Sequence, residues 1–305
     1  MTANPHAEPL QIQGACNVCG SSTARELYTA SDRLRNDGEL WTIAECSGCG
    51  VLRTLPELSE AELARYYPDE YWGAPEPSQS WIRSSQSEKT VFLSRCGLVG
   101  GRILDVGCGS GFFLRALDSA KWERFGIEPG EAAAKEAERF LGTGHVIVGS
   151  LIESGFAGST FDVITLWSAL EHANEPRANL REAKRLVKPG GTLIIQVPNA
   201  ASYQARFFQG DWFALDAPRH RYHFTFPLLE QLLSNNGFKI SRATYSSKAH
   251  NSHALRQSLK ARLLRRDSTL HRVLFLASIP FIKPFDAMMS ALNKGATLTV
   301  AAHSM

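Results

Sequence analysis

A strand-like run at 102–107 passes directly into a helical pattern through a turn that holds three glycines, Gly107, Gly109 and Gly111. Glycine permits positive φ angles and lets a ligand approach the backbone closely. A dinucleotide-binding turn would place its last glycine at position 112, where this chain has Phe112, and the turn also lacks the Lys-Ser/Thr pair of a triphosphate-binding loop. The turn therefore predicts a site for a ligand of another class at the carboxyl end of a strand.

The same alternation of strand and helix continues from 88 to about 246. Apolar strand-like runs, separated by helical patterns of crossover length, lie at 124–129, 145–150, 161–168, 192–199 and 238–246, and a last short run lies at 296–302. Strands with little polar alternation favour a mostly parallel sheet that helices cover on both faces. Since such crossovers are right-handed, we expect an α/β fold with a doubly wound, mostly parallel sheet.

An acidic residue ends the second of the strand-like runs. Glu128 follows Asp105 by 23 residues, at the end of the segment FGIE. A carboxylate in this place can accept two hydrogen bonds from a ribose diol, whether or not phosphates follow the ribose. The glycine turn and the downstream acid together predict a ligand that contains a nucleoside.

The D-x-G-x-G-x-G pattern at 105–111 resembles motif I of the class I S-adenosylmethionine (SAM)-dependent methyltransferases. Residues 161–176 resemble motif IV of that family, and residues 184–199 resemble its Lys-Pro-Gly-Gly turn and fifth strand. The resemblance implies a seven-stranded sheet, SAM as the cofactor, Glu128 on its ribose, and Asp105 as the residue that organises the glycine loop near the methionine end. The cofactor-binding residues that we expect are Asp105, Gly107, Gly109, Gly111, Glu128 and Trp167.

Histidines follow two of the expected strands. His172 lies just beyond the fourth strand, and the segment DAPRHRYHFTF at 216–226 carries His220 and His223. This segment resembles a Pro-Arg-His-x-x-His-Phe signature of a methyltransferase subgroup that also has an N-terminal cysteine-rich segment. Histidine titrates near neutrality and suits proton abstraction, so these three histidines are the candidate catalytic residues. The alternative is that they shape the pocket through structural hydrogen bonds.

Four of the six cysteines form two Cys-x-x-Cys pairs, Cys16 with Cys19 and Cys46 with Cys49. Two such pairs can place four thiolates tetrahedrally around Zn²⁺. With four protein ligands no coordination position stays open, so we expect structural rather than catalytic zinc. A redox dithiol is the alternative, although it requires one pair rather than two.

These features divide the chain into three parts. We expect a zinc-ribbon-like module at 14–73, a linker rich in Pro and Ser at 74–87, and a methyltransferase domain at 88–305. The domain carries a helical insertion at 247–292, before the last strand.

The insertion is basic in its first part and apolar in its second. Residues 248–272 hold seven Lys or Arg and one Asp, and the apolar run 273–285 follows. A helical lid over the acceptor site, with its charges solvated, is one interpretation. Peripheral contact of 248–285 with an anionic membrane surface is another, and the two are compatible.

The function that we expect is transfer of a methyl group from SAM to O or C of a small molecule, such as a sugar or a lipid-linked saccharide. The alternatives are an RNA or ribosome methyltransferase and a noncatalytic SAM-binding scaffold. The net charge of +3 does not indicate a broad nucleic-acid-binding surface, and we expect no specific nucleic-acid binding. The first residues lack the basic and apolar regions of a signal peptide, which favours a cytoplasmic protein, peripheral at the inner face of the membrane if the insertion binds lipid. The oligomeric state is left open.

Overall fold

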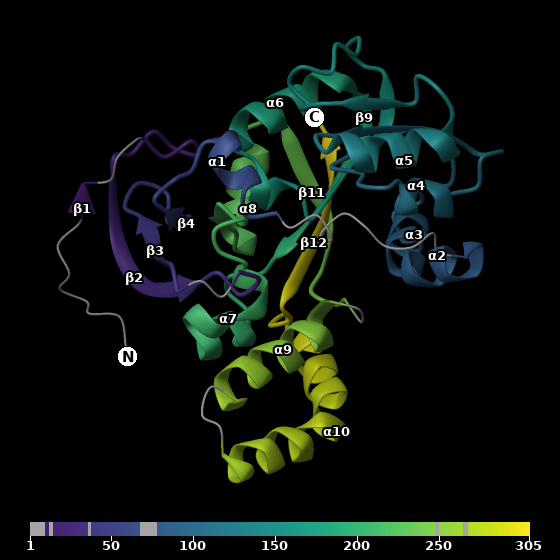
Figure 1. The fold of residues 1–305 in the computed structure, drawn as a ribbon. Coiled ribbons are helices and arrows are strands. Elements are labelled where there is room, and N and C mark those ends of the chain that lie inside the picture. The colour runs from purple at the N-terminus through teal and green to yellow at the C-terminus, as the bar shows by residue number, and fades with distance from the viewer. Residues whose placement is uncertain (1–9, 12–14, 36–37, 68–77, 248–249, 265–267) are drawn as a thin grey trace.

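The computed structural model describes residues 10–11, 15–35, 38–67, 78–247, 250–264 and 268–305 (Figure 1). The described residues form two β-sheets, one of seven strands and one of five.

The seven-stranded sheet is the centre of the molecule and has the order β11-β12-β9-β8-β5-β6-β7. Its strands are β5 (Gly101–Val106), β6 (Trp122–Glu128), β7 (Val146–Val148), β8 (Phe161–Trp167), β9 (Val187–Pro198), β11 (Phe238–Thr244) and β12 (Thr297–Ser304). The strands from β7 to β9 pair in parallel, whereas β12 is antiparallel to both of its neighbours. The expected doubly wound, mostly parallel sheet is therefore confirmed, and its switch point lies between β5 and β8.

Helices cover both faces of this sheet. One face is covered by α3 (Ser87–Arg95), α4 (Phe112–Ala116) and α5 (Glu131–Leu141), and the other by α6 (Pro176–Leu186) and α8 (Phe226–Ser234). Residues on β8 and β9 alternate between the two faces, as the pleat requires. Val163 and Ile194 pack with α3 and α4, whereas their neighbours Ile164 and Ile195 pack with α6 and α8.

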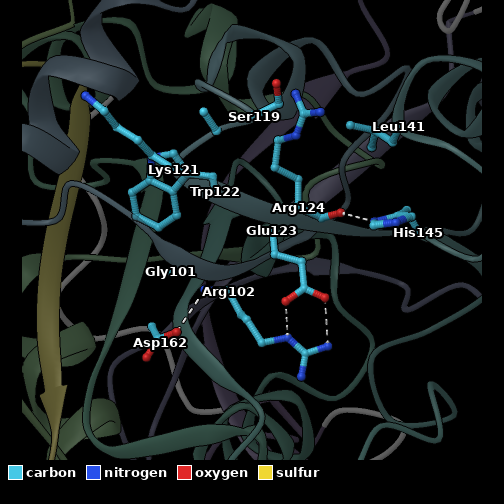
Figure 2. Close-up of a pocket in the computed structure, with 11 residues that line it drawn as sticks. Gly101, Arg102, Ser119, Lys121, Trp122, Glu123, Arg124, Leu141, His145 and Asp162 are labelled. Carbon is cyan, nitrogen blue, oxygen red and sulfur yellow. Dashed lines mark hydrogen bonds and ion pairs between the residues drawn. The ribbon is translucent and has the colours of Figure 1, made fainter.

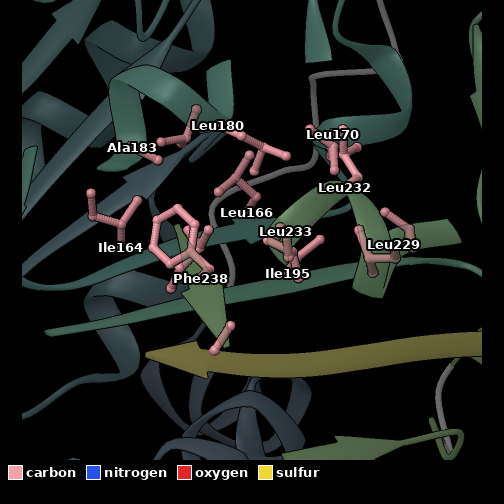
Figure 3. Close-up of a cluster of buried hydrophobic side chains, with 14 of the residues drawn as sticks. Ile164, Leu166, Leu170, Leu180, Ala183, Ile195, Leu229, Leu232, Leu233 and Phe238 are labelled. Atoms are coloured by element: carbon pink, nitrogen blue, oxygen red, sulfur yellow. The ribbon is translucent and has the colours of Figure 1, made fainter. Parts of the chain in front are cut away.

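Figure 3 shows the apolar core under α6 and α8. Both helices direct leucines at the sheet, and the labelled residues are Ile164, Leu166, Leu170, Leu180, Ala183, Ile195, Leu229, Leu232, Leu233 and Phe238. Each fully buried side chain of this size contributes about 1.5–3 kcal/mol to folding. Packing in this core holds the carboxyl ends of β8 and β9 in place. The candidate site lies at these strand ends.

The five-stranded sheet joins the N-terminal module to the rest of the chain. Its order is β1-β2-β3-β4-β10, with β1 (Leu10–Gln11), β2 (Thr23–Ser31), β3 (Leu40–Cys46), β4 (Leu52–Leu55) and β10 (Tyr222–His223). β10 comes from the segment after β9 and pairs antiparallel with β4, so that His223 lies opposite Leu52. The module and the histidine segment are therefore parts of one sheet, to the left in Figure 1.

The expected linker at 74–87 is in part helical. Residues 74–77 lie outside the described residues, and α2 (Gln79–Ser85) occupies most of the remainder. Ser78 caps this helix, because its hydroxyl accepts a hydrogen bond from the Trp81 amide. Before the linker, a short helix α1 (Glu60–Ala64) follows β4 and begins with a capping box at Ser59 and Glu62.

The expected helical insertion before the last strand is confirmed as a pair of helices, α9 (His250–Leu264) and α10 (Thr269–Ala291). α9 packs on α7 (Tyr203–Phe208) and on the short 3₁₀ helices η3 (Gln209–Asp211) and η4 (Phe213–Leu215). The Ser258 hydroxyl of α9 accepts a hydrogen bond from the Phe213 amide at 2.8 Å. α10 packs on α9 and lies farther from the central sheet, at the bottom of Figure 1.

Much of the apolar surface of α10 is exposed. Leu276 is 62% exposed and Phe281 is 71% exposed, and the buried residues of the helix are Phe275, Ile282 and Asp286. Among the described residues, α10 is the helix whose length and composition would allow it to cross a membrane, and 17% of its most apolar window is buried. Pro280 and Pro284 lie inside the helix.

Candidate active site

The glycine loop connects β5 to α4 at the switch point of the sheet. The φ angles of Gly107, Gly109 and Gly111 are +72°, +53° and +75°, a region that L side chains disfavour. A Cβ at Gly107 would lie 3.1 Å from Cβ of Ala169, and a Cβ at Gly111 would lie 3.1 Å from Cβ of Ala137. These two glycines let the loop pack against the end of β8 and against α5. A Cβ at Gly109 would have no atom within 4 Å, so here the loop faces open space.

Glu128 is fixed against this loop. Its Oε2 accepts a hydrogen bond from the Gly109 amide at 2.8 Å, and its Oε1 accepts one from the Gly130 amide at 2.9 Å. Burial raises the pKa of Glu128, and the two backbone hydrogen bonds oppose this shift. Each carboxylate oxygen keeps a further lone pair, so the group can accept hydrogen bonds from a ligand as well.

Asp105 lies next to the loop, near the end of β5. Its Oδ1 accepts a hydrogen bond from the Thr165 hydroxyl at 2.7 Å. Burial raises the pKa of Asp105 to about 7, against the opposing effects of Lys89 and Thr165. The ammonium group of Lys89 lies 5.4 Å from the ring centre of Trp167, and burial lowers the pKa of Lys89. The sequence analysis missed Lys89, because a single lysine in a helical pattern gives no indication of which strand end it faces.

Trp167 ends β8 and lies in the apolar core. It is 7% exposed, and its ring packs edge-on against Phe113 and Phe92. Its indole nitrogen is buried and has no hydrogen-bond partner among the described residues.

An adenosyl ligand with an amino-acid end fits the groups around the glycine loop. The open space over Gly109 adjoins an anchored carboxylate, which is complementary to a ribose diol. Asp105 and Lys89 bring groups of opposite charge to the same strand end, and these are complementary to the ammonium and carboxylate groups of an amino acid.

His172 lies at the end of the turn after β8. Ser168 is exposed, with φ +54°, and the short 3₁₀ helix η2 (Leu170–His172) follows it. Nδ1 of His172 lies 3.0 Å from the Arg219 carbonyl oxygen and 3.1 Å from the Tyr67 hydroxyl. Since a carbonyl only accepts, Nδ1 carries the proton and Nε2 keeps its lone pair. Burial lowers the pKa of His172, which favours this neutral form.

His220 has the same tautomer. Its Nδ1 lies 3.0 Å from the Ala214 carbonyl oxygen and donates to it, so Nε2 keeps its lone pair. Burial and the neighbouring His172 hold the pKa of His220 well below its usual range. The rings of His172 and His220 lie edge to face with their centres 4.6 Å apart.

His223 is held on the five-stranded sheet rather than beside His172. Its Nε2 lies 3.0 Å from the Thr54 hydroxyl, and that hydroxyl donates to the His220 carbonyl oxygen at 2.6 Å. Nε2 of His223 must therefore donate, which leaves a lone pair on Nδ1, and Nδ1 has no partner among the described residues. Burial lowers the pKa of His223 to about 4.

Glu171 completes a cluster that the histidine pattern alone did not reveal. One possible ligand atom from each of Glu171, His172 and His220 lies within 4.8 Å of the other two. Glu171 is 0% exposed, and burial raises the pKa of its carboxyl group to about 8. The sequence placed Glu171 beside His172, but it could not tell that the side chain points inward.

A buried ion network holds the histidine segment in place. The guanidinium of Arg219 donates to both oxygens of Asp32, at 2.7 and 3.0 Å, and to Oδ1 of Asp216. Arg219 and Asp32 are 0% and 1% exposed. Because Asp32 follows β2 and Asp216 precedes β10, the network ties the N-terminal module to the loop that carries His220.

The four N-terminal cysteines gather at one point. Sγ of Cys16 lies 4.0 Å from Sγ of Cys49, Sγ of Cys19 lies 3.5 Å from Sγ of Cys46, and all four sulfurs lie within 4.8 Å of one another. Sulfurs on a tetrahedral zinc ion, with bonds of about 2.3 Å, are separated by about 3.8 Å. The four thiols therefore fit a zinc ion. Cys96 and Cys108, the other two cysteines, lie outside this cluster, and none of the six forms a disulfide.

A separate cavity of about 510 Å³ lies at the opposite edge of the sheet (Figure 2). Its walls come from the amino-terminal ends of β5 and β6 and include Gly101, Trp122 and His145. Arg102 and Glu123, which are register partners on β5 and β6, form an ion pair in its wall at 2.8 Å. Ligands of doubly wound sheets bind at the carboxyl ends of the strands, so this cavity is not part of the candidate site.

Comparison with known proteins gives a family match for the central part of the chain. A family model described as a methyltransferase domain matches residues 79–243, more than half of the chain. The ubiquinone biosynthesis O-methyltransferase of Xanthomonas campestris pv. campestris (strain B100) is 26% identical over 180 residues, which are 56% of this chain and 75% of that protein. The enzyme of the same name from Alkalilimnicola ehrlichii is 31% identical over 137 residues, or 42% of this chain and 55% of the relative.

Solved structures show the same fold. An S-adenosylmethionine-dependent methyltransferase from Mesorhizobium loti has a TM-score of 0.50 at 16% identity, over 73% of this chain and 99% of that one. A protein from Pyrococcus horikoshii OT3 has a TM-score of 0.50 at 14% identity, over 82% of this chain and 100% of its own.

Proposed function

The chain belongs to the methyltransferase domain family and is a class I SAM-dependent methyltransferase, and we propose that it methylates a hydroxyl oxygen of a small-molecule acceptor. One observation carries the proposal. The anchored carboxylate of Glu128 and the open face of Gly109 lie at the same edge of the sheet as the histidine cluster after β8. The names of the similar O-methyltransferases support oxygen as the acceptor atom.

For the cofactor, we assign Glu128 to the ribose hydroxyls and the amides of Gly107, Gly109 and Gly111 to the wall of the site. Asp105 would accept from the ammonium group of the methionine end, and Lys89 would pair with its carboxylate. Trp167 would form the apolar floor behind Lys89. Bound SAM supplies a methyl group that its sulfonium has already activated, so the chain must orient the acceptor and take up a proton.

For the acceptor, we assign proton removal to the cluster of His172 and His220. Each has a neutral ring at pH 7 with a lone pair on Nε2, as a general base needs. The loop at Gly107 contacts Ala169, three residues before His172, and this contact supports a short path between cofactor and base. His223 would position the segment through Thr54 rather than take the proton.

The N-terminal cysteines are proposed to hold structural zinc. Four thiolate ligands would leave no open coordination position for an acceptor. The five-stranded sheet that the zinc ion would stabilise includes β10. The ion would then stabilise the strand pair that carries His223. The expected subdivision at 14–73, 74–87 and 88–305 remains our proposal for the domain boundaries, with the qualification that β10 bridges the first and the last part.

The helix pair α9 and α10 is proposed to cover the acceptor site and to contact a membrane. α9 packs on the segment between β9 and β10, which supports the lid. The exposed apolar side chains of α10, together with Lys260, Arg262 and Lys283, suit an anionic membrane surface at the cytoplasmic face. An acceptor with a long apolar chain would reach the site from there, as the name of the ubiquinone-pathway relatives also suggests.

The test is to incubate the purified chain with a cell extract and SAM whose methyl group is labelled with ¹³C, and to identify the labelled product by mass spectrometry and NMR. The proposal predicts a labelled small molecule whose methyl resonance is that of a carbon bonded to oxygen. A methyl bonded to carbon would contradict the O-acceptor, and label in RNA would favour an RNA methyltransferase. SAM binding without any labelled product would favour a noncatalytic scaffold.

A further inference from the structure

We propose that Glu171, His172 and His220 bind a divalent transition-metal cation at the carboxyl edge of β8. The metal site is inferred from the positions of these three side chains. Its role, which is to activate the acceptor hydroxyl, rests on the O-methyl transfer proposed above and would take the place of proton removal by His172 and His220, because a metal-bound imidazole has no free lone pair for a proton.

The three side chains converge at the spacing of a metal site. One ligand atom from each lies within 4.8 Å of the others. Ligands on one cation at about 2.0–2.2 Å lie about 3.3 Å apart in a tetrahedral arrangement. Small side-chain movements would close the remaining difference. A Zn²⁺ site with two histidines and one glutamate is a known catalytic ligand set.

Both histidines present the nitrogen that a metal needs. Each donates its Nδ1 proton to a backbone carbonyl, of Arg219 for His172 and of Ala214 for His220, and the lone pair is left on Nε2. Histidines that bind metals almost always donate their other ring N–H in this way, because the hydrogen bond fixes the tautomer and the ring orientation. The backbone therefore holds two neutral imidazoles in the form that metal binding requires.

Glu171 supplies a buried carboxyl group that no basic side chain pairs with. The side chain is fully buried, no ion pair of Glu171 is found among the described residues, and the groups that donate near its carboxyl are the Ser168 hydroxyl and the Glu171 backbone amide. A buried carboxylate without a charged partner is costly unless a proton or a cation balances its charge. Two imidazoles and a carboxyl group thus meet where no basic side chain supplies that balance.

The neighbouring arginines do not fill this role. The guanidinium of Arg219 is committed to Asp32, to Asp216 and to the Tyr66 carbonyl oxygen. Arg221 donates from its side chain to the Leu58 carbonyl and to Glu60, and its backbone amide donates to the Glu171 carbonyl oxygen. Neither guanidinium forms an ion pair with Glu171 among the described residues, which leaves a proton or a metal ion as the direct partner of its carboxylate.

The ligand set distinguishes this site from the cysteine cluster. Two imidazoles and one carboxylate suit Zn²⁺, Co²⁺, Mn²⁺ or Fe²⁺, and three protein ligands leave positions open. Ser168, at the other end of the same turn, is exposed, so the turn borders solvent. The cysteine cluster has four ligands and no open position.

A cation in this place would act as a Lewis acid. It would lower the pKa of an acceptor hydroxyl, whose proton leaves to solvent. The oxygen lone pair then forms the new C–O bond, and the electron pair of the broken C–S bond stays on the sulfur of the product. The negative oxygen and the positive sulfonium are both neutral after transfer, so charge and atoms balance.

The test uses the full chain, loaded with zinc at the cysteines, freed of weakly bound metal by a chelator, and titrated with Co²⁺ in the absence of SAM and acceptor. The proposal predicts one Co²⁺ per chain by equilibrium dialysis, with a spectrum that lacks thiolate charge-transfer bands. Glu171→Gln should weaken this binding at least tenfold, and Glu175→Gln, at the exposed glutamate that precedes α6, should leave it unchanged.

X-ray absorption of Co²⁺ bound to the wild-type chain identifies the ligand atoms and does not depend on the folding of a variant. Imidazole scattering without a cobalt–sulfur shell supports the site. No Co²⁺ bound at millimolar concentration, or equal binding by Glu171→Gln, overturns it and leaves a proton as the occupant. Because this test measures metal binding and not turnover, failure to bind Co²⁺ would refute the cation and leave the proposed O-methyl transfer intact.

Discussion

The carboxylate of Glu128, at the end of β6, accepts a hydrogen bond from the amide of Gly109 at 2.8 Å. The two residues are 19 apart in the chain and belong to neighbouring parallel strand ends. The bond turns the glycine loop and the acidic residue into one rigid unit, since the same carboxylate also holds the Gly130 amide at the start of α5. The proposed cofactor contacts all depend on this unit.

Loss of one cysteine should release zinc and loosen the five-stranded sheet. In Cys46→Ser, a ligand on β3 is removed, and the remaining three thiolates should hold the ion far more weakly. We expect less than one zinc per chain by elemental analysis and a lower Tm. Cys96→Ser, at a cysteine outside the cluster, is the control and should keep its zinc. Full zinc retention by Cys46→Ser would count against the proposed ligand set.

Removing the charge of Arg219 should destabilise the molecule strongly. Arg219→Met leaves Asp32 buried without its ion-pair partner and leaves Asp216 paired with Arg33 alone, and breaking a buried pair in this way typically costs about 3–5 kcal/mol. Burial raises the pKa of Asp216, but His220, once it is protonated at low pH, together with Arg33 and Arg219 holds this pKa below its usual range. The stability from this group is therefore present above the unfolded pKa of about 3.9 and is lost as the pH falls through the lower folded pKa. Chemical denaturation at pH 7 measures the loss, and an unchanged midpoint for Arg219→Met would contradict the role of the network.

The histidine cluster should set the acid limb of the pH profile. Burial lowers the pKa of both His172 and His220, so a base in this cluster stays neutral until the pH falls below the ordinary histidine value of about 6.5. We expect kcat to be level near pH 7 and to fall at lower pH. His172→Ala or His220→Ala should lower kcat about a hundredfold or more while the affinity for S-adenosylhomocysteine stays within twofold.

The matched control for these histidine variants is His303→Ala, at an exposed histidine near the end of β12. An acid limb above pH 7, or a loss of cofactor affinity equal to the loss of kcat, would argue that the histidines shape the cofactor pocket instead.

The exposed face of α10 should determine membrane binding. Replacing both Leu276 and Phe281 by Ser removes two large exposed apolar side chains, each worth about 1.5–3 kcal/mol when buried. We expect at least a tenfold loss of binding to vesicles that contain phosphatidylglycerol, measured by co-sedimentation. Val99→Ser changes an apolar residue that is 68% exposed elsewhere and should have no effect. If the wild-type chain does not bind such vesicles, α10 serves as a lid or as a protein interface.

The sequence predicted the parts of the fold that depend on local patterns. The apolar runs at 102–107 and 161–168 correspond to β5 and β8, and the glycine spacing predicted the turn between β5 and α4. Glu128 could be identified because its distance along the chain from Asp105 follows from the length of one βα unit. These relationships lie within a few tens of residues.

Contacts between segments that are far apart in the sequence could not be predicted from local patterns. β10 is only two residues long, and its pairing with β4 joins segments about 170 residues apart. The turn that carries Glu171 contacts the same distant segment, since the Arg221 amide, just before β10, donates to the Glu171 carbonyl oxygen. Lys89 likewise reaches Trp167 and Asp105 only after α3 has packed on the sheet.

The most direct measurement is the calorimetric affinity of Gly109→Val for S-adenosylhomocysteine, compared with Gly190→Val. Both glycines have positive φ, +53° and +71°, and a Cβ at either meets no atom within 4 Å, so the two variants carry similar backbone strain. Only the side chain at position 109 would enter the proposed cofactor space. We predict that Gly109→Val loses at least a hundredfold in affinity while Gly190→Val stays within a few fold of the wild type. An unchanged affinity in a folded Gly109→Val chain would contradict the placement of the cofactor over the glycine loop.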